Sequence, residues 1–344
     1  MKRQRFNKAI VFCTATVLLL CGSIPSIVSA QAANANAAQG LSISPALVEL
    51  NANYSTSYEV SLKVMNVTSS DLVYSYTVND FGSSDETGTP HVVMDDKLPA
   101  TASVITWVAP VPQFTLQAHQ TKTITVKINV PSNAEPGGHY AVLRFSGQAP
   151  DVVGSGVGLS VSAGVLLLVR VGNSNDITEK ASLASFYSEQ NGKQSWFFED
   201  SPKDNPITFV TRIQNDGNVH IKPIGNVEIR DMFGNLVKTL SVGNDQSNVL
   251  PQSIRRYDVT YDNSWMIGKY TASLALGYGT KGQAITSTFD FWVIPYKLIL
   301  AGIFILATII FILSRMIRVY NRHIIEKSKN ESSNKNKKHT KKKD

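Results

Sequence analysis

Cysteine is scarce in this chain of 344 residues: Cys13 and Cys21 are the only two. Both lie in residues 1–30, where four bases without an acid precede an apolar run and small residues end at Ala30. This pattern predicts a secretory signal peptide cleaved after Ala30. The mature chain then has no cysteine, which excludes disulfides and thiolate metal ligands, so its exported domains must be held by their cores alone.

Residues that build catalytic centres are also few. The six histidines are scattered, and none is spaced as a metal-binding pair. No nucleophile elbow, phosphate loop or dinucleotide fingerprint occurs, and the glycines from Gly154 precede no helical pattern. We therefore predict that the protein is not an enzyme. The prediction includes no catalytic residue, cofactor or metal site, and the binding residues remain unknown.

One acidic cluster is an exception to this shortage. Asp80, Asp85, Glu86, Asp95 and Asp96 fall within a single loop, residues 80–96. Such a loop could bind calcium, although the strict spacing of a calcium loop is missing. Solvated loop acids are the favoured interpretation, and the calcium alternative stays open.

Charge is nearly missing from the segment 291–313, which has only Lys297. A transmembrane helix is therefore predicted over residues 296–316, with Trp292 and Tyr296 as an interfacial aromatic belt. Arginines follow at once, which places a basic tail, residues 317–344, in the cytoplasm by the positive-inside rule. The predicted protein spans the cell membrane once, with its N-terminal ectodomain outside.

The net charge of +7 belongs to the two ends. Residues 315–344 hold eleven bases against three acids, so the ectodomain between the ends is net acidic. A nucleic-acid partner is therefore not predicted. The low-complexity run from Lys335 to Lys343 is predicted to be disordered, and the basic tail is predicted to meet anionic lipid head groups.

Amphipathic helix patterns are missing from the ectodomain, and β patterns take their place. Thr121–Val130 alternates most cleanly, with Ile124 and its neighbours on one face and Thr125 and its neighbours on the other. Short alternating runs between Gly, Pro, Asn and Asp turns predict an all-β ectodomain of two tandem Ig-like β-sandwiches. After a flexible leader, residues 31–39, the predicted domains are 40–173 and 178–294.

Two aromatic residues are candidates for ligand contacts. Trp107, at the start of a predicted strand, is interpreted as a core residue rather than a stacking platform. Tyr140 follows Pro136-Gly-Gly and precedes an apolar strand. It is interpreted as a corner tyrosine whose hydroxyl bonds to backbone nearby, with exposure to a ligand as the alternative.

Several segments together resemble a known family. "SISPALVEL", "TKTITVKINVPSNAEPGGHYAVLRF", "VTRIQNDGNVHIKPIGNVEIRD" and "GKYTASLALGYG" are similar to the WxL-interacting surface proteins of Gram-positive bacteria and their relatives. The resemblance implies two Ig-like domains, the first associated with peptidoglycan and the second with WxL-domain or host partners. It supplies no binding residue for this chain.

The predicted function is a non-catalytic, membrane-anchored surface protein that binds cell-wall glycan or another surface protein in adhesion or as a scaffold. The first alternative is an extracellular accessory or sensor subunit of a membrane complex. The second is a metal-dependent hydrolase on a β-fold. The sequence does not name the ligand, because Ig-like faces host many functions.

Overall fold

A computed structural model describes residues 40–94, 102–149, 160–173, 175–199, 202–203, 205–262 and 265–340. The predicted signal peptide and leader, Asp95 and Asp96 lie outside the described residues. The described chain is all β up to residue 293 and ends in one long helix. The predicted fold class is thereby confirmed.

Strands β1–β10 build the first sandwich from two facing sheets. One sheet has the order β1-β3-β8 and the other the order β2-β10-β9-β4-β7, with β5 and β6 forming a separate hairpin. The strands are β1 (Leu41–Ser44), β2 (Leu47–Ala52), β3 (Ser57–Asn66), β4 (Leu72–Asn79), β5 (Phe81–Ser83), β6 (Pro90–Val92), β7 (Phe114–Leu116), β8 (Thr121–Asn129), β9 (Gly137–Gln148) and β10 (Ser160–Val171).

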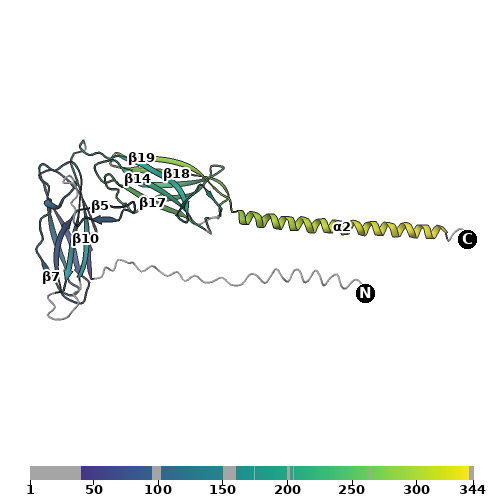
Figure 1. Ribbon diagram of the computed structural model, residues 1–344, viewed down its shortest axis with the longest axis horizontal. Helices are drawn as coiled ribbons and strands as arrows, with labels where there is room; N and C mark the ends of the chain where they lie inside the picture. Colours follow the sequence, from purple (N-terminus) through teal and green to yellow (C-terminus); the bar gives the residue numbers. More distant parts are fainter. Residues whose placement is uncertain are drawn as a thin grey trace.

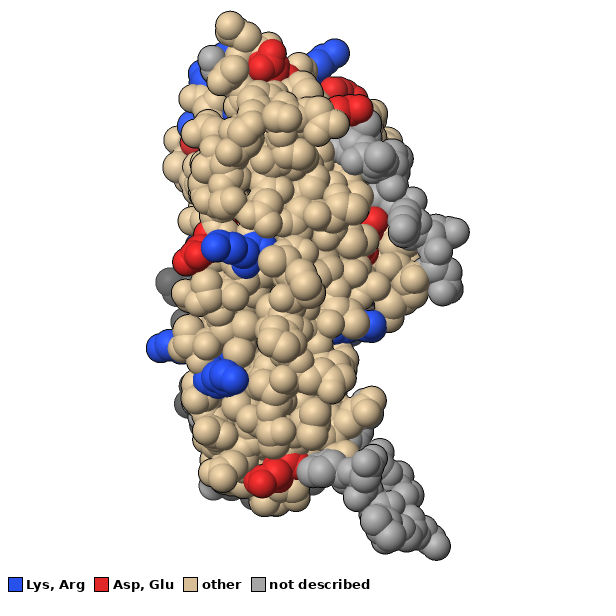
Figure 2. Space-filling model, turned by 90° about the vertical axis from the view of Figure 1, so that its left-hand side faces the viewer, with Lys and Arg blue, Asp and Glu red and all other residues tan. Residues whose placement is uncertain are grey.

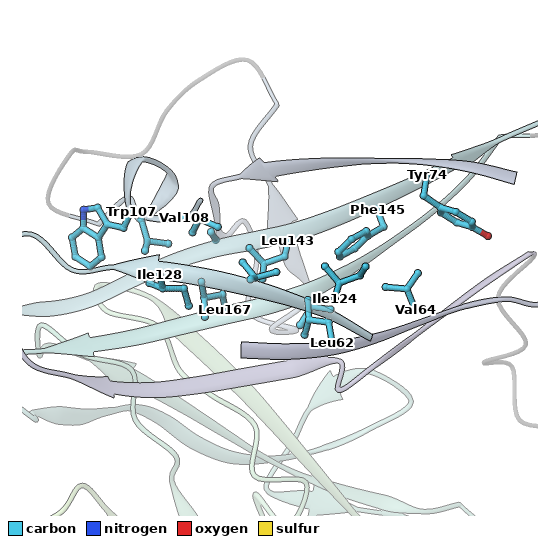
Figure 3. Packing of buried hydrophobic residues seen from close by; sticks show 14 of the residues in the cluster. Leu62, Val64, Tyr74, Trp107, Val108, Ile124, Ile128, Leu143, Phe145 and Leu167 are labelled. Atoms are coloured by element: carbon cyan, nitrogen blue, oxygen red, sulfur yellow. The ribbon is translucent and has the colours of Figure 1, made fainter. Parts of the chain in front are cut away.

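Alternation along the strands fills the space between these two sheets. Ile124 and Ile128 of β8 point inward and meet Leu143 and Phe145 of β9 and Leu167 of β10 (Figure 3). Their neighbours on β8 are exposed, as the period of two requires. Burial of such side chains is the main stabilising term for a sandwich that has no disulfide.

Strands β11–β19 build the second sandwich with the same logic. Its sheets have the orders β12-β11-β14-β17 and β13-β19-β18-β15-β16. The strands are β11 (Ala181–Gln190), β12 (Lys193–Gln194), β13 (Phe197–Phe198), β14 (Ile207–Asn215), β15 (Ile224–Asp231), β16 (Leu236–Val242), β17 (Ile254–Tyr261), β18 (Gly268–Tyr278) and β19 (Gln283–Val293). In both sandwiches a short early strand, β2 or β13, pairs in parallel with the last strand.

Two segments that the sequence pattern predicts as strands have another structure. Leu41–Leu50 alternates as a single strand would, but it forms two strands on different sheets, because Pro45 cannot donate to a ladder and interrupts it. Ile105–Trp107 is a short 3-10 helix, η1, instead of a strand. Trp107 is nevertheless buried, which confirms its interpretation as a core residue.

Helix α2 (Tyr296–Thr340) leaves the end of the second sandwich that lies opposite the first (Figure 1). Its segment Ile299–Arg322 is long and apolar enough to cross a membrane, and none of its most apolar stretch is buried against the sandwiches. The helix continues through residues predicted to be disordered, since neither proline nor glycine follows Gly302. The first sandwich thus stands at the far end of the molecule from the helix.

Candidate functional site

The junction between the two sandwiches begins at β9 and β10. Most of β9 is buried on both faces, and so are residues 167–169 of β10, where Val165–Val169 is a continuous apolar run in the sequence. Val165 and Leu167 of β10 face the first core, whereas Leu168 joins Phe81 and Tyr140 in a separate apolar cluster on the outer face. Leu250 of the second sandwich packs on that cluster. The two sandwiches therefore share a small apolar core.

Tyr140 crosses this junction. Its ring is buried edge-on to Phe81 at 5.9 Å, and its hydroxyl accepts a hydrogen bond of 3.0 Å from the backbone N–H of His220. The structure therefore confirms burial but gives the hydroxyl a partner in the second sandwich instead of the predicted nearby backbone. Burial raises the pKa of the Tyr140 phenol and lowers the pKa of His220 to about 4, so the pair is neutral at pH 7.

The Pro136-Gly-Gly turn contacts the same segment of the second sandwich, residues 218–220. The N–H of Gly138 donates to the carbonyl of Asn218 at 2.8 Å, and the Asn218 amide reaches the carbonyl of Pro136 at 3.3 Å. Gly137 has a φ of +139°, and a side chain there would meet the Asn218 carbonyl. Glycine is required at this position because the backbone of the second sandwich approaches so closely.

A polar recess of about 270 Å³ opens beside the tyrosine. Glu49 of β2 accepts from Lys222 at 2.6 Å and from Asn248 at 2.9 Å, and both partners belong to the second sandwich. Burial alone would raise the pKa of Glu49, but these hydrogen bonds outweigh it and the pKa lies below its usual value. Arg170 pairs with Glu179 at 2.7 Å on the other side of the recess. The recess is thus lined by charges that are already paired.

The β5–β6 hairpin also links the two sandwiches. We call its contacts through Glu86, and the contacts of Glu49 described above, the two clamps. Glu86 at its tip holds the Arg212 guanidinium with both carboxylate oxygens, the Nε contact being 2.6 Å. Its backbone carbonyl also accepts from the N–H of Arg256 at 2.7 Å. The hydrogen bonds from Arg212 lower the pKa of Glu86. The acidic loop therefore includes an arm that grips the second sandwich.

The other acids of the loop have local roles. Asp80 is buried and accepts from the Ser103 hydroxyl at 2.8 Å, and Asp85 accepts from the N–H of Thr87 at 2.9 Å. Across the described part of the chain, no three His, Cys, Asp or Glu side chains gather as metal ligands. Because Asp95 and Asp96 are not described, the calcium alternative is not tested for the whole loop.

An apolar cavity of about 260 Å³ lies between the hairpin, β10 and the loop before β17. Its apolar lining residues include Leu47, Phe81, Leu166, Leu168 and Leu250, and polar residues such as Asp245 and Arg255 line it as well. Two polar atoms in residues lining it, the hydroxyl of Ser247 and Oδ1 of Asn248, are buried without a hydrogen-bond partner in the structure. The protein covers almost all of the surface of these two atoms, so they are not open to a group bound in the cavity.

This cavity was missed by sequence reasoning because its walls come from distant segments. One signal was available: the run Val165-Leu-Leu-Leu-Val169 is too apolar for a strand with one wet face. The outer end of the first sandwich, by contrast, carries only scattered charged groups (Figure 2). The cavity at the junction is therefore the best-formed candidate site.

The sequence matches no protein-family model, and no curated protein matches it. Among solved structures, the class 5 fimbriae chaperone CfaA is similar at 12% identity and a TM-score of 0.38, covering 72% of this chain and 98% of that one. The E. coli chaperone DraB matches at 18% identity and 0.33, covering 73% and 96%. A PapD-like domain of human CEP192 matches at 9% and 0.26, covering 44% and 99%. Likenesses this weak carry no functional argument.

Proposed function

We propose that this chain is a non-catalytic, membrane-anchored surface protein whose junction cavity binds an apolar side chain of another surface protein. The observation that carries the proposal is the cavity itself, with its apolar walls. A leucine or aromatic side chain fits such walls. Sugars, whose surfaces carry many hydroxyls, suit these walls less well.

The remaining parts fit a surface protein. Helix α2 supplies the anchor, and its basic end suits a cytoplasmic tail beside anionic lipid head groups. The resemblance to WxL-interacting surface proteins supports a protein partner at the surface and names peptidoglycan as the competing ligand. The clamps at Glu49 and Glu86 keep the cavity walls in place before a ligand arrives.

Site-specific photo-crosslinking on cells tests the proposal. A photoreactive amino acid replaces Leu47, which is exposed at the cavity rim, or Thr125, which is exposed on β8 in the other sheet. We expect a discrete protein adduct from position 47 and none from position 125. An adduct that a muramidase degrades would show wall glycan as the ligand, and no adduct at position 47 would contradict binding at the cavity.

A further inference from the structure

Large apolar side chains are exposed at one end of the second sandwich. They belong to three segments, and they are Trp196, Phe197, Met232, Phe233, Trp265 and Ile267. Phe233 is 82% exposed and Trp196 is 67% exposed, which is far more than such residues usually show. Soluble surfaces rarely gather apolar groups in this way unless the patch meets a partner or a membrane. We call these six residues the apolar end.

Strand register and one side-chain contact place all three segments at the same edge. Phe197 pairs with Trp292, and Gly268 pairs with Val293, the last residue of β19. The Met232 methyl group lies over Gly268, which brings the β15–β16 turn to this edge as well. Helix α2 leaves from the same end of the sandwich (Figure 1).

The β15–β16 turn presents its phenylalanine on a fixed backbone. Asp231 accepts hydrogen bonds from the N–H groups of Phe233 and Asn235 and from the Asn235 side chain, all at 2.9 Å. These bonds lower the pKa of Asp231, led by the Asn235 side chain. The exposed ring is therefore held out by a structured turn, so that little ordering is needed when it is buried.

The distance to the membrane is short. Only Ile294 and Pro295 separate β19 from α2, and the apolar span begins at Ile299. With a helical rise of about 1.5 Å per residue, the span begins within about 15 Å of the end of β19. Interfacial side chains typically enter the head-group region by about 5–10 Å. The apolar end thus lies level with the outer head groups if α2 crosses the bilayer.

We infer that the apolar end of the second sandwich inserts into the outer leaflet of the membrane and fixes the ectodomain upright on it. The inference rests on the proposed membrane anchor. Tryptophan and phenylalanine are the residues that favour this depth. The Lys203 ammonium, 5.6 Å from the Trp265 ring, stands where a lipid phosphate would meet it.

The four tryptophans of the chain make the inference testable. Trp107 is buried in the first sandwich and serves as a constant reference, whereas the other three are exposed and accept phenylalanine. The full chain is placed, one copy per disc, in nanodiscs of anionic lipid brominated high on its acyl chains, because bromine quenches tryptophan at short range. One variant keeps Trp107 alone, and three others add back Trp196, Trp265 or Trp292.

We expect the Trp196 and Trp265 variants to lose as much emission as the Trp292 variant, and the Trp107 variant to lose none. If only Trp292 is quenched, the anchor stands and the inference is wrong. If Trp292 is not quenched either, both the anchor and the inference fail. The emission of each variant in unbrominated discs is the reference against which its own loss is measured.

Discussion

Tyr140 shows at the level of one atom how the two sandwiches depend on each other. Tyr140→Phe removes the acceptor of the His220 N–H and is expected to lower the free energy of unfolding by about 0.5–1.5 kcal/mol, a typical net hydrogen bond. Denaturant unfolding of the full chain in detergent measures the loss. The bond lies between sandwiches, so an isolated first sandwich would not register it.

Tyr76 provides the matched control for that experiment. Its hydroxyl is buried without a partner, and burial raises its pKa. Tyr76→Phe removes an unsatisfied group, so it is expected to leave stability unchanged or to raise it. Equal losses in both variants would mean that the Tyr140 hydroxyl contributes nothing across the junction.

Two buried asparagines occupy matching places at the ends of β3 and β14. Asn66 donates to the carbonyls of Ser70 and Leu116, and Asn215 donates to those of Val219 and Val249. Each side chain thereby joins its own turn to a neighbouring segment. Asn66-Val-Thr matches the sequon for N-glycosylation. Because Asn66 is fully buried, a glycan cannot be attached to it in the folded chain.

Replacing either asparagine by alanine removes one donor from each of these carbonyls. We expect Asn66→Ala and Asn215→Ala each to cost about 2–4 kcal/mol, measured by denaturant unfolding. Asn129 is exposed, and among the described side chains its amide hydrogen-bonds only with the Ser57 hydroxyl. Asn129→Ala should therefore lower the free energy of unfolding by less than about 0.5 kcal/mol. A small effect at Asn66 or Asn215 would show that water replaces the amide.

At the scale of elements, long alternating strands could be predicted and short ones could not. β8 and β18 carry enough alternating positions to reveal their period in the sequence. The strands β5, β6, β12 and β13 have only two or three residues each, which is too short to show a period in the sequence. They are strands because of their pairing partners: β5 pairs with β6, β12 with β11, and β13 with β19. Local sequence does not specify these partners.

The candidate site was less predictable than the fold for a related reason. Pro136-Gly-Gly stood out in the sequence, but its partner Asn218 lies 82 residues away from Pro136. Glu86 was seen as a loop acid, since nothing local indicates its pairing with Arg212. Contacts between domains depend on the placement of whole sandwiches, which local patterns do not encode.

The hairpin and β2 clamps should make the junction sensitive to acid. The pKa values of Glu49, Glu86 and Glu179 are lowered in the folded chain, so their contribution is present above the unfolded values and is lost as pH falls. The pKa of His220 is also lowered, from about 6.5 to about 4, so protonation disfavours the folded form over the same fall in pH. All four groups weaken the junction in the same direction.

Spin or dye labels on Ser61→Cys and Thr286→Cys, one in each sandwich, measure that opening. We expect the distance between labels to lengthen as pH falls from about 6.5, the unfolded pKa of His220, to below 4.5, the ordinary pKa of the three glutamates. The double variant Glu49→Gln, Glu86→Gln should shift the opening toward neutral pH. An unchanged distance in acid would mean that the apolar cluster around Leu168 holds the sandwiches without the clamps.

At the scale of the whole molecule, the absence of cysteine from the predicted mature chain allows the predicted orientation to be tested. Only the predicted signal peptide contains cysteine, so one introduced thiol is unique in the mature chain. An impermeant maleimide should label Ser61→Cys on intact, wall-stripped cells. Ser332→Cys, in the basic tail, should react only after lysis. The reverse result would invert the topology.

The pairing of β18 with β19 has a mechanical consequence. A pull between the first sandwich and α2 passes along β19, because only Ile294 and Pro295 separate that strand from the helix. The eleven residue pairs that join β18 to β19 lie side by side along the direction of that pull. Their hydrogen bonds bear the load together, in shear, rather than opening one after another. The second sandwich is therefore built to transmit tension between the first sandwich and α2 before it unfolds.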